Sequence, residues 1–292
     1  MRPVARAGVR DYVLLTKPRI IELLLVTTIP VMFAAARGWV PLRLLVCTVI
    51  GGTLAAASAN VFNCVLDRDI DAAMRRTAHR GTASGVVGVS QAVSFATSLG
   101  LASVALLGVF VNWLSAALAL AAIVAYVGGY TVLLKRRTAS NIVWGGVAGC
   151  FPVLIGWAAV NGSISAAALA LFLVVFFWTP PHYWPLSIKF ADDYNAAGVP
   201  MLGAVASGPT VARAVVRYTW ATVAVSLSYA PLAGAGAVYW VVASAAGVWF
   251  LWEAYRLRAR AGEPAAAMRV FHASISYLTL VFIAVGVDAF VR

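Results

Sequence analysis

Charge is the scarcest property of this sequence. Only 11% of the 292 residues are Asp, Glu, Lys or Arg, whereas 62% are hydrophobic. Water-soluble domains carry roughly 25% charged residues. A chain with so little charge cannot cover a water-facing surface. Lipid is therefore its expected solvent, and a soluble globular domain is excluded.

Strands with alternating polarity are lacking as well. A transmembrane β-barrel needs segments of about ten residues that alternate apolar and polar side chains. The apolar runs here are unbroken and about 20 residues long, the length that a helix needs to cross the hydrocarbon. The first 18 residues are polar and basic, and the first apolar run is full length, so we expect an anchor and no cleavable signal.

Cysteine is rare and carries no metal-binding pattern. Cys47, Cys64 and Cys150 lie within apolar runs or at their ends, without the spacing of metal ligands. Free cysteines of this kind usually behave as small buried hydrophobic residues. We expect the same here.

The apolar runs predict an all-α, polytopic membrane protein with about nine transmembrane helices. The chain is expected to form a single transmembrane domain over residues 1–292, with residues 1–18 as a cytoplasmic N-terminal segment. Backbone polar groups must be satisfied within each span in lipid, so each span is taken as helix. The predicted spans are 19–36, 44–65, 91–111, 114–134, 141–160, 166–188, 215–233, 236–255 and 270–290.

Loop charge predicts the orientation. With nine spans, all but three of the 22 basic residues fall on the side of the N-terminus; the exceptions are Arg37, Arg43 and Arg292. The positive-inside rule then places the N-terminus in the cytoplasm. The expected location is the inner membrane of a bacterial-type cell. This asymmetry explains the net charge of +12 through contact with membrane lipid, so no nucleic-acid partner is expected.

Five of the ten acidic residues lie in two inside loops, after the second and the sixth span. Asn63, Asp67 and Asp71 lie at the first loop with the spacing i, i+4, i+8, so they share one helix face. Like charges at this spacing repel each other. Mg²⁺ prefers carboxylate oxygen and often shares its shell with substrate phosphates. These three residues, which we call the acidic stripe, therefore predict a magnesium–diphosphate site.

An alternative for this stripe is a solvated helix end that pairs with Arg68, Arg75 or Arg76. Asp69 points away from the stripe. It either pairs with an arginine or serves as a ligand of a second metal.

The second loop brings a cation next to two carboxylates. Asp192 and Asp193 follow Lys189 by three and four residues. Lys189 can hold a phosphate as a point charge or pair with Asp193. His182 lies near the end of the sixth span, where it can ligate a metal, shuttle a proton or serve as a hydrogen-bonded structural histidine.

The two acidic loops resemble those of the UbiA-type intramembrane prenyltransferases, in which acidic motifs follow the second and sixth helices. Asn63, Asp67 and Asp71 match the motif N-x-x-x-D-x-x-x-D. Further blocks resemble the heme-farnesylating branch of that family over nearly the whole chain. They are residues 16–19, 67–80, 130–138, 141–146, 181–194 and 198–201. Lys189 replaces the usual aspartate of the second motif, and Gly81 follows Arg80 where this branch normally has proline.

The resemblance implies a reaction and a set of roles. The farnesyl group of farnesyl diphosphate would be transferred to the 2-vinyl group of heme b, giving heme O for terminal oxidases. Mg²⁺ would be bound by Asp67, Asp71 and Asp193, and heme b would be a substrate rather than a cofactor. A heme A synthase is the protein partner that this pathway suggests.

The implied site has a catalytic and a substrate-binding part. The catalytic residues are Asn63, Asp67, Asp71, Lys189 and Asp193. The substrate-binding residues are Arg76, Arg80, Lys135, Arg136, Asn141, His182, Asp192 and Tyr194.

Two other functions remain open at the level of sequence. The first is a prenyltransferase of the same family that acts on an aromatic acid precursor of quinones. The second is a cation transporter, because acidic groups in membranes suit ion pathways. Transporter sites, however, lie near the bilayer midplane on broken helices, whereas these acids gather at one face.

Overall fold

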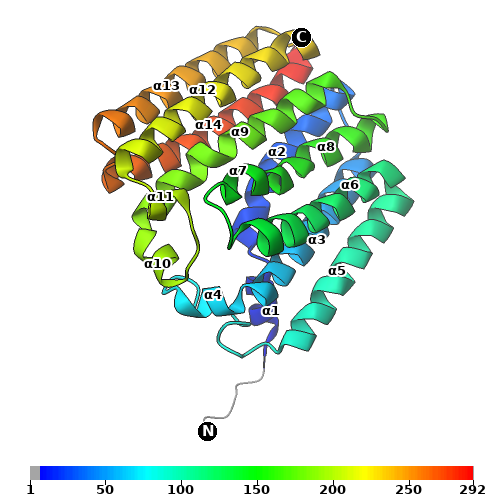
Figure 1. Cartoon of the computed structure of the whole chain (residues 1–292). Coiled ribbons are helices and arrows are strands. Elements are labelled where there is room, and N and C mark those ends of the chain that lie inside the picture. Colours follow the sequence, from blue (N-terminus) through cyan, green and yellow to red (C-terminus); the bar gives the residue numbers. More distant parts are fainter. Residues whose placement is uncertain (1–6, 292) are drawn as a thin grey trace.

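The computed structural model describes residues 7–291, and its regular structure is entirely helical over that range (Figure 1). Arg2, Arg6 and Arg292, which entered the count of loop charges, lie outside the described residues. The all-α fold expected from the apolar runs is confirmed.

Nine segments of the described chain are long. They are α2 (Pro18–Ala36), α3 (Leu42–Leu66), α5 (Val89–Phe110), α6 (Trp113–Val124) with the π-helix η1 (Ala125–Leu134), α7 (Asn141–Gly145) with α8 (Val147–Asn161), α9 (Ala166–Lys189), α12 (Gly208–Ala233), α13 (Ala237–Ala259) and α14 (Pro264–Val291). The short helices are α1 (Val9–Leu15), α4 (Arg68–Ala73), α10 (Ala191–Ala196) and α11 (Leu202–Val205).

Eight of these segments between residues 7 and 291 are long and apolar enough to cross a membrane. They correspond to eight of the nine predicted spans, and they make the chain a multi-pass membrane protein. The remaining long helix, α12, has 26 residues and contains Arg213 and Arg217. It packs along α9 and α13, so it is part of the same bundle.

Two helices extend beyond the predicted seventh and ninth spans at their N-terminal ends. Helix α12 begins at Gly208 rather than at residue 215, and α14 begins at Pro264 rather than at residue 270. Arg213 and Arg269, which had been counted among the inside charges between spans, lie within these helices. Both helices instead continue past the apolar segment, since a helix keeps its backbone hydrogen bonds wherever it leaves the lipid.

Small residues let the helices approach closely. A Cβ atom on Gly156 of α8 would lie 2.9 Å from the carbonyl oxygen of Thr28 in α2. A Cβ atom on Gly286 of α14 would lie 3.0 Å from Pro30 of α2. Helix association in membranes depends on such close packing, because lipid is as apolar as the side chains. Helix α2 is thereby held between α8 and α14.

The two acidic loops lie at one end of the bundle. Figure 1 shows α1, α4 and α10 together at one end of the bundle. An ion pair of 3.8 Å between Arg75, after α4, and Asp193, in α10, joins the two loops. The expectation that these loops share one side of the membrane is therefore consistent with the fold.

A buried carboxylate fixes the other end of the bundle. Asp288 in α14 is 2% exposed and accepts the backbone N–H groups of Gly236 (2.8 Å) and Tyr239 (3.2 Å). These groups belong to the first turn of α13, which has no intrahelical partners for them. Asp288 thus caps α13 from the neighbouring helix, a contact between residues far apart in the sequence.

Replacing Asp288 by alanine should destabilise the fold by about 1 kcal/mol, as expected for a lost helix cap. Asp288→Asn keeps one acceptor oxygen and should lose less. Thermal unfolding of the purified variants in detergent measures the effect. Equal unfolding temperatures for the wild type and Asp288→Ala would contradict the role of this cap.

Candidate active site

The acidic stripe lies at a break between two helices. Helix α3 ends at Leu66, and α4 begins at Arg68, yet backbone hydrogen bonds continue from Asn63 to Asp67 (2.9 Å) and from Asp67 to Asp71 (2.7 Å). The three side chains therefore stay on one side, as the spacing predicts. They are buried, with exposed fractions of 2% for Asn63, 0% for Asp67 and 2% for Asp71.

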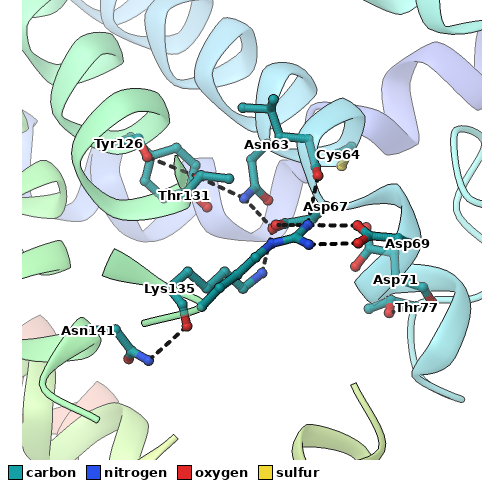
Figure 2. Close-up of polar contacts among 12 residues, drawn as sticks. Asn63, Cys64, Asp67, Asp69, Asp71, Thr77, Tyr126, Thr131, Lys135 and Asn141 are labelled. Atoms are coloured by element: carbon teal, nitrogen blue, oxygen red, sulfur yellow. Dashed lines mark hydrogen bonds and ion pairs between the residues drawn. The ribbon is translucent and has the colours of Figure 1, made fainter. Parts of the chain in front are cut away.

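Two cations neutralise the buried carboxylates, Lys135 from a segment distant in sequence and Arg80 from the same loop as Asp71. Lys135 donates to Oδ2 of Asp67 at 2.5 Å, and Figure 2 shows it reaching this group from the chain beyond η1. Arg80 donates from one nitrogen to both oxygens of Asp71, each at 2.8 Å. The stripe is thus not a solvated helix end paired with Arg68, Arg75 or Arg76, which was the alternative. Its partners are two of the predicted substrate-binding residues.

Asp69 faces away from this centre. Its carboxylate is 62% exposed and forms two hydrogen bonds of 2.7 Å with the Arg136 guanidinium. These hydrogen bonds lower the pKa of Asp69 to about 2. Of the two roles considered for Asp69, the structure shows the ion pair with an arginine. Arg136 also lies 3.9 Å from Oδ1 of Asp67, so it contributes positive potential to the stripe.

Lys17 is a third cation at the centre. Its Nζ donates to Oδ1 of Asn63 at 2.5 Å, while Nδ2 of Asn63 donates to Asp67 (2.6 Å) and Thr131 (3.0 Å). The Lys17 backbone has φ 54° and ψ 64°, the left-handed conformation that is uncommon outside glycine. Burial lowers the pKa of Lys17 to about 8.

A π-helix carries Lys135 to the site. Helix α6 widens into η1, where the hydroxyl of Thr131 donates to the Tyr126 carbonyl (3.0 Å) and the backbone N–H of Lys135 donates to the Tyr130 carbonyl (2.8 Å). The backbone bond of Lys135 spans five residues, as in a π-helix, and such segments are frequent at functional sites. The winding brings Thr131 to Asn63 and Lys135 to Asp67, two residues of the same stripe.

Two further residues support this segment. Asn141 is fully buried, and its Nδ2 donates to the Lys135 carbonyl at 3.3 Å, so it positions the lysine. A Cβ atom on Gly145 would collide with the ring of Tyr130, so glycine is required where α7 meets η1.

The second loop lies beside this centre without joining a carboxylate cluster. Asp193 pairs with Arg75 rather than with Lys189. Lys189 and Arg76 both lie over the ring of Phe190, at 5.6 and 5.5 Å. No group of three potential metal ligands occurs within residues 7–291. The assignment of Asp193 as a third metal ligand stays a prediction.

The remaining two predicted residues of the second loop differ in their surroundings. Asp192 is exposed to solvent. Tyr194 is buried, and this burial raises the pKa of its hydroxyl while neighbouring Arg76 opposes the rise. Tyr194 is therefore neutral at physiological pH and can donate a hydrogen bond.

An apolar cavity of about 210 Å³ lies among α2, α3, α6, η1, α7, α8, α9 and α14. Its wall includes Tyr126 and Tyr130 of η1. These tyrosines precede Thr131 and Lys135, the residues of η1 and its end that reach the stripe. His182 lines the cavity and is 7% exposed. An apolar chamber thus adjoins a centre of paired charges.

Sequence reasoning missed Lys17 and Thr131 as residues of this centre. Lys17 had entered only as one inside charge and as part of a family block. The sequence feature that could have identified Lys17 is its position directly before a proline at the start of a span. Thr131 had no signal, because its contact with Asn63 depends on the π-helical winding of η1.

The sequence profile described as the UbiA prenyltransferase family matches residues 24–275. The chain belongs to this family of membrane-embedded prenyltransferases. It is 57% identical over 281 residues to a protein of Clavibacter michiganensis subsp. michiganensis named protoheme IX farnesyltransferase, covering 96% of this chain and 92% of that relative. A Streptomyces avermitilis protein of the same name is 53% identical over 291 residues, covering 98% and 95%.

Solved structures show the same fold at low sequence identity. A structure described under digeranylgeranylglyceryl phosphate synthase superposes with a TM-score of 0.79 at 16% identity, over 97% of this chain and 99% of that one. A UbiA homologue from Archaeoglobus fulgidus bound to DMAPP and Mg²⁺ gives a TM-score of 0.70 at 14% identity, over 95% and 99%.

Lys17 should titrate with a pKa of about 8, whereas solvent-exposed lysines titrate near 10.4. Burial disfavours its charged form, so the proton leaves as the pH rises through about 8. Reductive ¹³C-methylation followed by an NMR pH titration measures this value. The low-pKa resonance should be missing in Lys17→Arg, and a wild-type spectrum in which every lysine titrates near 10 would contradict the burial of its charge.

Proposed function

We propose that this protein transfers the farnesyl group of farnesyl diphosphate to the 2-vinyl group of heme b, giving heme O and diphosphate. The observation that carries this function is the identity of 53–57% over nearly the whole chain to proteins named protoheme IX farnesyltransferase. The paired charges beside an apolar cavity supply a matching site: the charges suit a diphosphate and the cavity suits a prenyl tail.

The carboxylates of the stripe are suited to bind Mg²⁺. Oδ1 of Asp67 is buried and accepts no hydrogen bond from any described residue. A buried, ionised oxygen without a donor is costly, and a hard cation is the partner that carboxylate oxygen prefers. We assign Asp67 and Asp71 as metal ligands, with Asp193 as a further ligand from the second loop. Bound Mg²⁺ would neutralise charge on the leaving diphosphate.

The basic residues are suited to hold the diphosphate. Lys135 and Arg80 now pair with Asp67 and Asp71. When a magnesium diphosphate enters, the metal would satisfy the carboxylates, and the two cations would turn to the phosphate oxygens. Lys17 and Arg136 add positive charge at the same centre. Lys189 of the second loop and Arg76 of the first loop both lie over Phe190, where they can approach the diphosphate from its other side.

The remaining predicted residues support these groups. Asn63 links Asp67 to Lys17 and so orients the metal ligand or a phosphate oxygen. Asn141 positions Lys135. Tyr194 supplies a neutral hydroxyl at the second loop, and Asp192 remains at the solvent-exposed rim.

The apolar cavity is suited to the farnesyl chain. Its wall is mainly aliphatic and aromatic, and the Tyr126 and Tyr130 rings, which stack at 5.6 Å, line it. Exclusion of water protects an allylic cation from premature hydrolysis. The vinyl group of heme b then attacks C1 of the farnesyl cation, and water adds to the resulting cation beside the porphyrin, releasing one proton.

We further propose a single transmembrane domain over residues 1–292 in a bacterial-type inner membrane, with the N-terminus and both acidic loops in the cytoplasm. Membrane lipid surrounds the bundle, and heme A synthase is a candidate protein partner, because it would consume the product. Membership in a prenyltransferase family removes the cation-transporter alternative.

The mass of the product tests the acceptor. Detergent-purified protein incubated with heme b, farnesyl diphosphate and Mg²⁺ should give heme O, which exceeds heme b by a farnesyl group and a hydroxyl group. A parallel reaction with an aromatic acid precursor of quinones serves as the comparison. Prenylation of the aromatic acid without heme O would reject the proposed acceptor in favour of the family alternative.

Replacing Asp67 by asparagine should lower the rate of heme O formation by about 100-fold or more, since a metal ligand contributes several kcal/mol to stabilising the transition state. EDTA should abolish activity, and Mg²⁺ should restore it. Asp69→Asn is the matched control, because it removes an exposed carboxylate two residues away.

Asp69→Asn should retain most of the activity if Asp69 only pairs with Arg136. A loss equal to that of Asp67→Asn would instead assign Asp69 to a second metal. Full turnover by a folded Asp67→Asn variant would reject the metal role of the stripe.

A further inference from the structure

His182 is held in one orientation by residues on two helices. Its Nδ1 lies 2.8 Å from the hydroxyl of Ser274 in α14. Trp178, one turn earlier in α9, donates from its indole N–H to the carbonyl of the same Ser274 at 2.7 Å. The imidazole stacks on Trp178 and Phe271, with centroid distances of 4.3 and 4.7 Å and interplanar angles of 17° and 24°.

The hydrogen bonds of Ser274 determine the tautomer of His182. The Ser274 hydroxyl donates its only proton to the carbonyl of Phe271 at 2.6 Å. It must therefore accept the hydrogen bond from His182, so Nδ1 carries the imidazole proton. In the neutral ring, Nε2 is then unprotonated and has a free electron pair.

The surroundings of His182, a residue of the apolar cavity wall, leave the Nε2 edge of its ring open. Both faces of the imidazole are stacked against aromatic rings, and the Nδ1 edge is occupied by Ser274. His182 is nevertheless part of the cavity wall, and the edge that carries Nε2 is the part of the ring left without a contact to Trp178, Phe271 or Ser274. No hydrogen bond to Nε2 is present among residues 7–291.

We propose that Nε2 of His182 is an axial ligand to the iron of the porphyrin substrate. Histidines that ligate metals almost always donate their other ring N–H to a neighbouring acceptor, which fixes the tautomer and ring orientation. Ser274 provides that acceptor. A porphyrin bound in this way stands perpendicular to the imidazole, with its face toward the edges of Trp178 and Phe271. This inference rests on the proposed function, because it deepens the binding of the heme substrate.

The alternative is a histidine that only fills space in the helix interface. In a packing role the imidazole only fills space between the helices. The iron of the substrate would then contribute nothing to its binding. An iron porphyrin and the same porphyrin without iron therefore separate the two roles. Both probes have the same ring, vinyl groups and propionates, so contacts other than ligation affect them alike.

The test measures the binding of heme b and of metal-free protoporphyrin IX to wild type and His182→Ala in detergent. Ligation predicts that His182→Ala weakens heme binding by about tenfold or more while binding of the metal-free ring is unchanged. The Soret and electron paramagnetic resonance spectra of bound ferric heme should lose the signature of an axial imidazole. Free imidazole should restore that signature in His182→Gly.

Ser274→Ala is the companion variant. It keeps the histidine but removes the acceptor of its Nδ1–H, so the imidazole signature should persist with weaker heme affinity. Binding of metal-free porphyrin also reports whether each variant is folded. Should His182→Ala fail to fold, His182→Gln provides the same comparison.

Equal losses for the two porphyrins, or identical heme spectra in wild type and His182→Ala, would overturn ligation by His182. In that case, continued formation of heme O by the wild type would leave the proposed function intact. A wild-type protein that binds neither porphyrin and forms no heme O would reject both.

Discussion

Two ionised carboxylates inside an apolar bundle impose the constraint on which this structure depends. A buried charge is tolerated only when it is paired and hydrogen-bonded, and removing one partner leaves the other uncompensated. Asp67 and Asp71 obtain their compensation from Lys135 and Arg80, which reach them from after η1 and after α4. The site therefore holds together segments that are remote in sequence. Binding of the proposed magnesium diphosphate would have to exchange these pairs rather than simply fill a space.

The features that could be predicted from sequence are those that depend on residue spacing within a single helix. Unbroken apolar runs placed the spans because their length must match the hydrocarbon. The spacing of Asn63, Asp67 and Asp71 placed them on one face because backbone hydrogen bonds continue through the break at Asp67. The contacts of Lys17 could not be predicted, since they depend on how α2 packs beside α3 and on one left-handed residue.

The second loop shows where local reasoning ends. Lys189 and Asp193 have the spacing of a helical ion pair, but α9 ends at Lys189 and α10 begins at Ala191. Phe190, with φ −109° and ψ 27°, interrupts the helix between them. The i, i+4 rule holds only within a continuous helix. Asp193 consequently pairs with Arg75 of the other acidic loop, a partner that no spacing in the sequence identifies.

The π-helix also bears on how this site can arise and be lost. A π-turn contains one residue more than the α-turn it replaces, so η1 is the kind of segment that a single inserted codon creates. In an α-helix each residue advances the chain by about 100° around the axis. Deleting one residue between 125 and 134 would therefore rotate Lys135 away from Asp67 while leaving the hydrophobic length of the span nearly unchanged. With Lys135 and Asp67 in their proposed roles, membrane insertion and catalysis would be separable by the smallest possible change in chain length.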